Sequence, residues 1–261
     1  MGCGVSYLGN VQGWWDNLTI DLIRPWTDQE LADFYKNFRR PEGLTKVENG
    51  ALDVLVVRGL FNRLYRIDAA VKTLPNSEQY DAYTAYHPQR GTTLSGYQWD
   101  WKPLWDLDVV VLANVETKGL NYGQVLLLSE WVKDGGGLLI LGGPLTLGQD
   151  DNMKRAWPLL LPVELKGPWE MRKCDPPVRL PTLGNAVVMY RHLVTPKDGA
   201  AVLLKGAGGE PLLVGKGYGK GRVAVFSGTV LGEPPEGNKA FWETAAWQSE
   251  LAKAIAWVAG K

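Results

Sequence analysis

Few residues of this 261-residue sequence have the types and spacing that catalysis requires. The candidates for acid–base chemistry are three carboxylates, Glu116, Asp150 and Asp151, and one imidazole, His192. Side chains of these types carry most proton transfers in hydrolases, so they predict a carboxylate-based hydrolase if they converge. His192 has no glutamate two positions further on, so no histidine–glutamate pair supports it as a catalytic base.

Neither cysteine of the sequence is well placed to act as a nucleophile. Cys174 lies in the sequence KCDPP, and a proline-bound irregular segment is a poor setting for a nucleophile on a sharp turn. The other cysteine, Cys3, is far away, which gives neither metal-ligand spacing nor a disulfide framework. With His87 and His192 as the only histidines, we expect no metal site and no cofactor.

The amino-acid composition limits the kinds of binding partner that the protein could have. The 28 basic and 28 acidic residues give a net charge of zero, which argues against nucleic-acid binding. No apolar run reaches the roughly 20 residues that cross a bilayer, and no signal peptide is visible. We therefore expect a soluble and preferably cytoplasmic protein without a transmembrane segment. The 12 tryptophans, several in polar stretches, leave a homo-oligomer or a larger complex open.

The element that would position these groups is the stretch from Asp108 to Gly148. Its two continuous apolar runs, 109–112 and 138–141, are typical of strands covered on both faces. Between them Tyr122, Val125, Leu128 and Val132 recur at helical spacing, and three glycines at 135–137 end the helix. The pattern predicts a β-α-β unit.

The rest of the chain adds elements around this unit. We expect a buried strand at 53–57 and an amphipathic helix from Leu60 to Leu74. Further expected elements are a short strand near 82–86, a long loop around 91–96, irregular chain at 164–185, strands at 186–190 and 200–204, a hairpin at 211–228 and a helix at 238–259.

The sequence pattern of the first 50 residues differs from that of the rest of the chain. Thr27 and Glu30 form a capping box that predicts one helix, running to about Phe38. We therefore divide the chain into an N-terminal arm with one helix, 1–50, and an α/β domain, 51–261.

The order of motifs resembles a known superfamily. DVVVLANV, then EWVKDGGGLLILGG, then Leu161-Pro162-Val163 resembles the class I glutamine-amidotransferase-like proteins, and within them the ThuA-like branch associated with sugar utilisation. GYGKGRVAVFSG and the terminal FWETAAWQSELAKAIAW are similar to the same branch. The resemblance spans roughly residues 51–260. It implies a flavodoxin-like three-layer α/β sandwich with a mostly parallel sheet and a C-terminal antiparallel hairpin.

The resemblance also implies where a nucleophile would stand. Active relatives carry a cysteine on the tight turn that follows a strand, beside backbone N–H donors. The corresponding turn here, Gly142-Gly143-Pro144-Leu145, has neither Cys nor Ser, and Pro144 removes one donor. We therefore expect no glutaminase activity. We favour a protein that is not an enzyme, that is, a pseudoenzyme that keeps the fold of an enzyme superfamily without its activity.

A ligand site is expected beyond the carboxyl ends of the parallel strands, where ligands bind open α/β sheets. The residues at those ends are Arg58, Gly59, Asn114, Glu116, Gly143, Pro144 and Ser227. Trp99, Trp101 and Trp105 add a rim on which sugar rings could stack. The alternative is that these tryptophans cover the sheet or a partner interface.

Three functions therefore stay open. The first is a non-glutaminase ligand-binding domain linked to carbohydrate metabolism, with a small sugar-like ligand. The second is an interaction or assembly module of a larger complex. The third is the hydrolase that uses carboxylates at the strand ends.

Overall fold

The structure is a computed structural model that describes residues 50–87, 91–95, 102–116, 119–120, 122–144, 146–147, 157–165 and 171–261. All of these belong to one structural unit, 38–261. The predicted arm and its helix near Thr27 lie outside the described residues.

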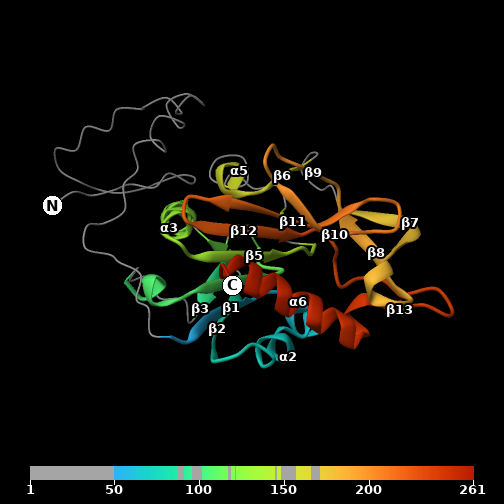
Figure 1. The fold of residues 1–261 in the computed structure, drawn as a ribbon, viewed down its shortest axis with the longest axis horizontal. Helices are drawn as coiled ribbons and strands as arrows, with labels where there is room; N and C mark the ends of the chain where they lie inside the picture. The colour runs from blue at the N-terminus through green and yellow to red at the C-terminus, as the bar shows by residue number, and fades with distance from the viewer. Residues whose placement is uncertain are drawn as a thin grey trace. The chain divides into compact units, whose positions relative to one another are not determined.

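A mixed sheet of eight strands forms the centre of this unit (Figure 1). In spatial order its strands are β10 (Ala201–Lys205), β11 (Pro211–Tyr218), β12 (Gly221–Phe226), β5 (Gly137–Leu141), β4 (Val109–Ala113), β1 (Leu52–Arg58), β2 (Ser77–His87) and β3 (Gly91–Ser95). The five strands from β12 to β2 run parallel, and the others extend the sheet with antiparallel pairs. The fold class is therefore mixed α/β with a mostly parallel central sheet.

The three middle strands explain why the sequence forms this sheet. Every residue of β1, β4 and β5 is buried, as expected for apolar runs covered on both faces. The predicted β-α-β unit is confirmed, because α3 (Tyr122–Lys133) joins β4 to β5 and buries Val125, Leu128 and Val132. Gly135, with φ +124°, follows the helix end.

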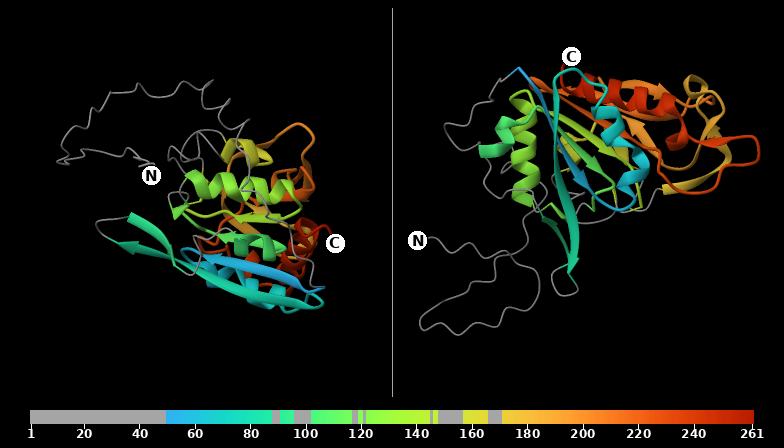
Figure 2. Two further views of the ribbon diagram at one scale, coloured as in Figure 1. Left: turned by 90° about the vertical axis from the view of Figure 1, so that its left-hand side faces the viewer. Right: turned by 90° about the horizontal axis from the view of Figure 1, so that it is seen from below.

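Helices cover both faces of the sheet (Figure 2). On one face α3 packs with the 3-10 helix η2 (Lys102–Asp106) and the short α5 (Trp157–Leu160) over Val110, Leu138 and Val225. On the other face α2 (Ile67–Val71) and α6 (Ala245–Val258) cover Val54, Val111 and Phe226. No helix among the described residues is long and apolar enough to span a membrane.

The strand order changes direction at β1. The next strand in the chain, β2, pairs on one side of β1, whereas β4 pairs on the other. The carboxyl ends of β1 and β4 therefore border the switch point at which open α/β sheets usually bind ligands.

The C-terminal hairpin is confirmed. β11 and β12 pair antiparallel from Leu213–Phe226 to Tyr218–Gly221. β12 then joins β5 in parallel, so the hairpin extends the sheet directly from its parallel core. The strands predicted at 186–190 and 200–204 are also present, as β8 (Ala186–His192) and β10.

A smaller sheet lies beside the central one and corrects the prediction of irregular chain at 164–185. It consists of β7 (Met171–Arg179), β8 and β13 (Lys239–Ala240), with the 3-10 helix η4 (Pro181–Leu183) after β7. β7 was missed because prolines such as Pro176 and Pro177 are unusual inside strands. A two-stranded sheet pairs β6 (Val163–Leu165) with β9 (Val194–Pro196).

The predicted helix from Leu60 to Leu74 is wrong in extent. A 3-10 turn, η1 (Asn62–Tyr65), precedes the five-residue α2, because Phe61 and Arg66 both adopt left-handed backbone conformations that interrupt an α-helix. Leu60 and Leu64, which an amphipathic helix would place on its apolar face, are 45% and 40% exposed.

Two further predictions need correction. The short strand and long loop expected after residue 80 are a long β2 and its antiparallel partner β3. The last helix begins at Ala245 rather than at 238, after the 3-10 helix η5 (Phe241–Glu243), and Thr244 caps it by accepting from the Trp247 N–H at 3.2 Å. The helix buries Trp247, Leu251, Ala254, Ile255 and Val258 along one face.

Candidate functional site

The turns that follow β1, β4 and β5 meet at the switch point and form what we call the strand-end junction, defined by Gly59, Asn114, Gly142, Gly143 and His192. The Gly59 N–H donates to the Ala113 carbonyl at 2.9 Å, and the Asn114 N–H donates to the Leu141 carbonyl at 3.1 Å. The three turns are thereby tied to one another by their own backbone groups.

Asn114 is the centre of this junction. It is fully buried, and its φ of +48° is a conformation that Asn tolerates better than most residues. Its side-chain amide donates to the Leu60 carbonyl at 2.8 Å, while its Oδ1 accepts from the Thr146 hydroxyl at 3.2 Å. The side chain is thus bonded at both ends inside the protein.

The glycines of the junction are required by this close packing. An ideal Cβ at Gly59 would lie 1.9 Å from the Asn114 carbonyl oxygen. At Gly143 it would lie 2.1 Å from Asn114 Oδ1, and side-chain carbons never approach so closely. A side chain at position 143 would therefore require Asn114 to move.

His192 closes the junction from β8. Its Nε2 lies 3.2 Å from the Gly143 amide nitrogen and 3.1 Å from the Gly143 carbonyl oxygen, so the tautomer decides which group it bonds. Burial lowers the pKa of His192 to about 4, against a smaller opposite effect of the Gly143 backbone. His192 is therefore neutral near pH 7.

Tyr65 of η1 contacts the junction from the face of the sheet that α2 and α6 cover. It is fully buried, and its hydroxyl donates to the Gly142 carbonyl. Burial raises the pKa of this phenol, so it stays protonated and remains a donor. Internal contacts thus fill the space around the turn after β5, and its polar backbone groups form hydrogen bonds within the protein.

Arg58 is turned toward α2 rather than toward the junction. Its side chain is 9% exposed, and its Nε donates to Asp81 at 2.9 Å while its terminal nitrogens contact Asp68, Asp81 and Asn62. Burial raises the pKa of Asp68, but the hydrogen bonds from Arg58 and Gln79 outweigh it and the net pKa is lowered. This ion-pair network joins β1, β2 and α2.

The other predicted site residues are dispersed. Ser227 is fully buried and donates from its hydroxyl to the Pro211 carbonyl at 3.0 Å. Glu116 and Pro144 are half-buried. Trp105 cannot stack on a ligand, because it is 1% exposed and donates to Asp134 at 3.0 Å.

Four predicted residues lie outside the described ranges. They are Trp99, Trp101, Asp150 and Asp151. Their sugar-stacking and hydrolytic roles therefore stay predictions, as does the convergence of either aspartate with Glu116. Within the described residues, no group of three or more His, Cys, Asp or Glu side chains could hold a metal ion.

Little open space lies beneath the junction on the α3 face. A cavity there of about 10 Å³ is lined by Leu112, Val115, Leu120, Ile140, Thr146, Leu147 and Trp157. A volume of this size holds about one water molecule at most.

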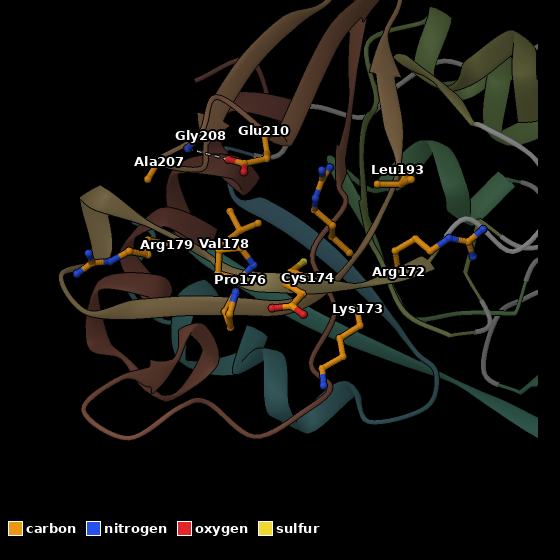
Figure 3. A pocket seen from close by; sticks show the side chains of 13 residues that line it. Arg172, Lys173, Cys174, Pro176, Val178, Arg179, Leu193, Ala207, Gly208 and Glu210 are labelled. Atoms are coloured by element: carbon orange, nitrogen blue, oxygen red, sulfur yellow. Dashed lines mark hydrogen bonds between the residues drawn. The ribbon is translucent and has the colours of Figure 1, made fainter.

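A much larger hollow lies elsewhere, beside the small sheet (Figure 3). We call it the β7 groove. Its volume is about 420 Å³, within the usual range of ligand pockets. It is lined by Arg172, Lys173, Cys174, Asp175, Pro176, Pro177, Val178, Arg179, Arg191, Leu193, Ala207, Gly208 and Glu210.

The floor and walls of the groove differ in character. Cys174 and Val178 are buried and belong to the core that α6 covers, so the floor is apolar. Burial raises the pKa of the Cys174 thiol, and the nearby Arg191 only partly opposes this. Cys174 is therefore a protonated floor residue, without the thiolate that nucleophilic catalysis requires.

Sequence reasoning missed this groove altogether. Its residues come from β7, from Arg191 of β8, from Leu193 just after β8 and from the turn at 206–210, and the sequence pattern predicts irregular chain where β7 lies. The available signal was the group of basic residues on both sides of KCDPP, but only strand pairing shows that they lie around one hollow.

Comparisons with known proteins support the fold alone. No protein-family model and no curated protein matches the chain. A cytoplasmic protein from Salmonella typhimurium LT2 has a similar structure, with a TM-score of 0.60, 14% identity and coverage of 79% of this chain and 99% of that one.

Two further solved structures are similar. A second cytoplasmic protein from Salmonella typhimurium has a TM-score of 0.58 and 15% identity over 79% of this chain and 98% of its own. A ThuA-like protein from Parabacteroides merdae ATCC 43184 has a TM-score of 0.51 and 15% identity, covering 81% of this chain and 91% of that one. The described unit thus shares its fold with a ThuA-like protein.

Proposed function

We propose that this chain is an amidotransferase-like domain that binds a small ligand of carbohydrate metabolism and does not hydrolyse glutamine. The single observation that carries the proposal is the overlap between Asn114 and any side chain at position 143. A nucleophile there has no space, and the backbone of the same turn is engaged by His192 and Tyr65.

The proposal includes a flavodoxin-like arrangement of the central sheet. In chain order the parallel strands are β1, β2, β4, β5 and β12, and their spatial order is β2-β1-β4-β5-β12. This is the 2-1-3-4-5 order of the flavodoxin-like doubly wound sheets. Helices on both faces support a three-layer sandwich.

The link to carbohydrates rests on the motif resemblance alone, whereas the ThuA-like structural neighbour supports the fold. We also infer a cytoplasmic location, which is supported by the two Salmonella neighbours described as cytoplasmic proteins. For the ligand, we favour the β7 groove over the strand-end junction, because the groove offers about 420 Å³ and the junction residues bond one another.

A ligand screen by calorimetry and thermal shift tests this function. The full chain is titrated with a panel of neutral mono- and disaccharides, sugar acids and sugar phosphates, and we expect at least one to bind and raise Tm. If no member of the panel binds at millimolar concentration, the ligand-binding proposal is overturned.

A second candidate is an interaction module, favoured by one specific observation. Leu60, Phe61 and Leu64, which follow β1 at the switch point, are 45%, 46% and 40% exposed. Adjacent exposed apolar side chains of this size are common at protein interfaces. Light scattering after gel filtration tests it: a dimer in the wild type that Phe61→Asp and Leu64→Asp convert to a monomer would favour this function.

A further inference from the structure

The β7 groove is opened by an irregularity in strand pairing. Lys173 lies opposite Tyr190, and Val178 lies opposite Val188. The four β7 residues between them, 174–177, therefore face Met189 alone on β8. Such a bulge bends the strand and redirects its side chains, and bulges of this kind are frequent beside binding sites.

The bulge lies next to a pair of like charges. Arg172 and Arg191 are directly opposite each other on β7 and β8. Like charges at directly opposed positions of an antiparallel pair repel and destabilise the sheet.

Arg191 has no carboxylate partner in the part of the chain that the structure describes. It is half-buried, and its charge acts on the Cys174 thiol in the groove floor. A half-buried guanidinium beside an apolar floor interacts more strongly with an anion than an exposed one does, because less water screens it.

The charged residues that line the groove are mainly positive when all are counted. Four basic residues line it, Arg172, Lys173, Arg179 and Arg191, against the two carboxylates Asp175 and Glu210. The Glu210 carboxylate accepts from the Gly208 N–H at 3.0 Å, so it is held in its own turn (Figure 3). The lining thus has a formal excess of two positive charges.

We propose that the β7 groove binds the oxyanion of a small organic ligand, a carboxylate or a phosphoryl group, with Arg191 as its anchor. This inference rests on the proposed ligand-binding function and specifies its ligand class as a sugar acid or a sugar phosphate. The planar guanidinium of Arg191 offers two parallel N–H donors, which match either oxyanion, while the apolar floor at Cys174 and Val178 contacts the ligand body.

Calorimetry with three matched probes tests the inference. D-glucuronate, D-glucose 6-phosphate and neutral D-glucose are titrated into the full chain at constant ionic strength. We expect one or both anions to bind and glucose to bind much more weakly. Binding of glucuronate alone assigns a carboxylate, and binding of the phosphate ester alone assigns a phosphoryl group.

Variants then place the anion at Arg191. Arg191→Gln should weaken binding of the anion roughly ten- to hundredfold, because it removes charge-assisted hydrogen bonds. Arg191→Lys keeps the positive charge but lacks the two parallel N–H donors of the guanidinium group, so it should bind the anion with intermediate affinity. Arg63→Gln, which removes an exposed arginine of η1, should leave the affinity unchanged.

A stability measurement separates this role from a structural one. Without ligand, Arg191→Gln should leave Tm nearly unchanged, because Arg191 makes no ion pair among the described residues. A clear drop in Tm, or anion binding that Arg191→Gln does not weaken, would overturn the inference. If neither anion binds while the wider sugar panel yields a ligand, the inference fails alone; if the panel also yields none, both proposals fail.

Discussion

The Asn114 side chain occupies the space that any side chain at position 143 would need, since an ideal Cβ at Gly143 would lie 2.1 Å from Asn114 Oδ1. Asn114 is held there by Leu60 and Thr146 through hydrogen bonds of 2.8 and 3.2 Å. The turn after β5 is therefore shaped for packing, at the place where the motif resemblance would put a nucleophile.

Gly143→Ala should lower the free energy of unfolding by about 2 to 3 kcal/mol, because overfilling a packed interior forces neighbours to shift. Chemical denaturation measures this. The matched control is Gly217→Ala on β11, where an added Cβ meets nothing within 4 Å, and it should cost less than about 0.5 kcal/mol.

A double-mutant cycle extends this test. Asn114→Gly keeps the backbone conformation accessible, because glycine tolerates the φ of +48°, and it removes the obstructing side chain. The two substitutions should therefore be less destabilising together than the sum of their separate effects. Strict additivity would show that Asn114 is not what fills the space.

The pH dependence of stability should reflect His192. Its pKa is lowered to about 4 in the folded protein, from an ordinary 6.5 when unfolded, so the unfolded state binds more protons between these values. Stability is then complete above about pH 7 and falls on acidification, by about 2 kcal/mol at pH 5.

Denaturation curves between pH 7.5 and 5 measure this contribution in His192→Gln, which does not titrate. The slope in this range should largely disappear in this variant and persist in His87→Gln, which removes the other histidine. A slope that is the same in all three proteins would show that His192 is not buried in its neutral form.

The ion pairs of Arg58 should stabilise the packing of β1, β2 and α2 against one another. Arg58→Met is expected to cost about 1.5 to 3 kcal/mol, because it removes charge-assisted hydrogen bonds to Asp81 and Asp68 from a buried side chain. Arg63→Met, at an exposed position, should change the free energy of unfolding by less than about 0.5 kcal/mol.

Asp81→Asn provides the second arm of a cycle with Arg58→Met. If the two side chains interact as described, the double variant loses less stability than the sum of the single variants. An interaction energy near zero would mean that the contact between Arg58 and Asp81 contributes nothing.

Continuous apolar runs and helical spacing were sufficient to predict β4, α3 and β5, because these patterns follow directly from burial on both faces of a sheet. The helix at Leu60–Leu74 was overextended because nothing in the residue types shows that Phe61 and Arg66 adopt left-handed conformations. β7 was missed because its prolines argue against a strand, whereas the bulge accommodates them.

The candidate sites were predictable only in part. The missing nucleophile at Gly142-Gly143-Pro144 is visible in the sequence, but the overlap with Asn114 depends on how two distant turns pack. Likewise, Arg172 and Arg191 become a pair only through the register of β7 and β8. Such contacts depend on tertiary structure, which periodicity does not encode.

Glutamine hydrolysis is the most direct test of the closed turn. The purified full chain is incubated with L-glutamine and release of glutamate is followed, for the wild type and for Gly143→Cys, which places a thiol on the turn after β5. We predict no release above the buffer rate for either protein, since Asn114 blocks position 143. Hydrolysis by the wild type that is lost in Cys174→Ser or His192→Gln would contradict a non-hydrolytic domain.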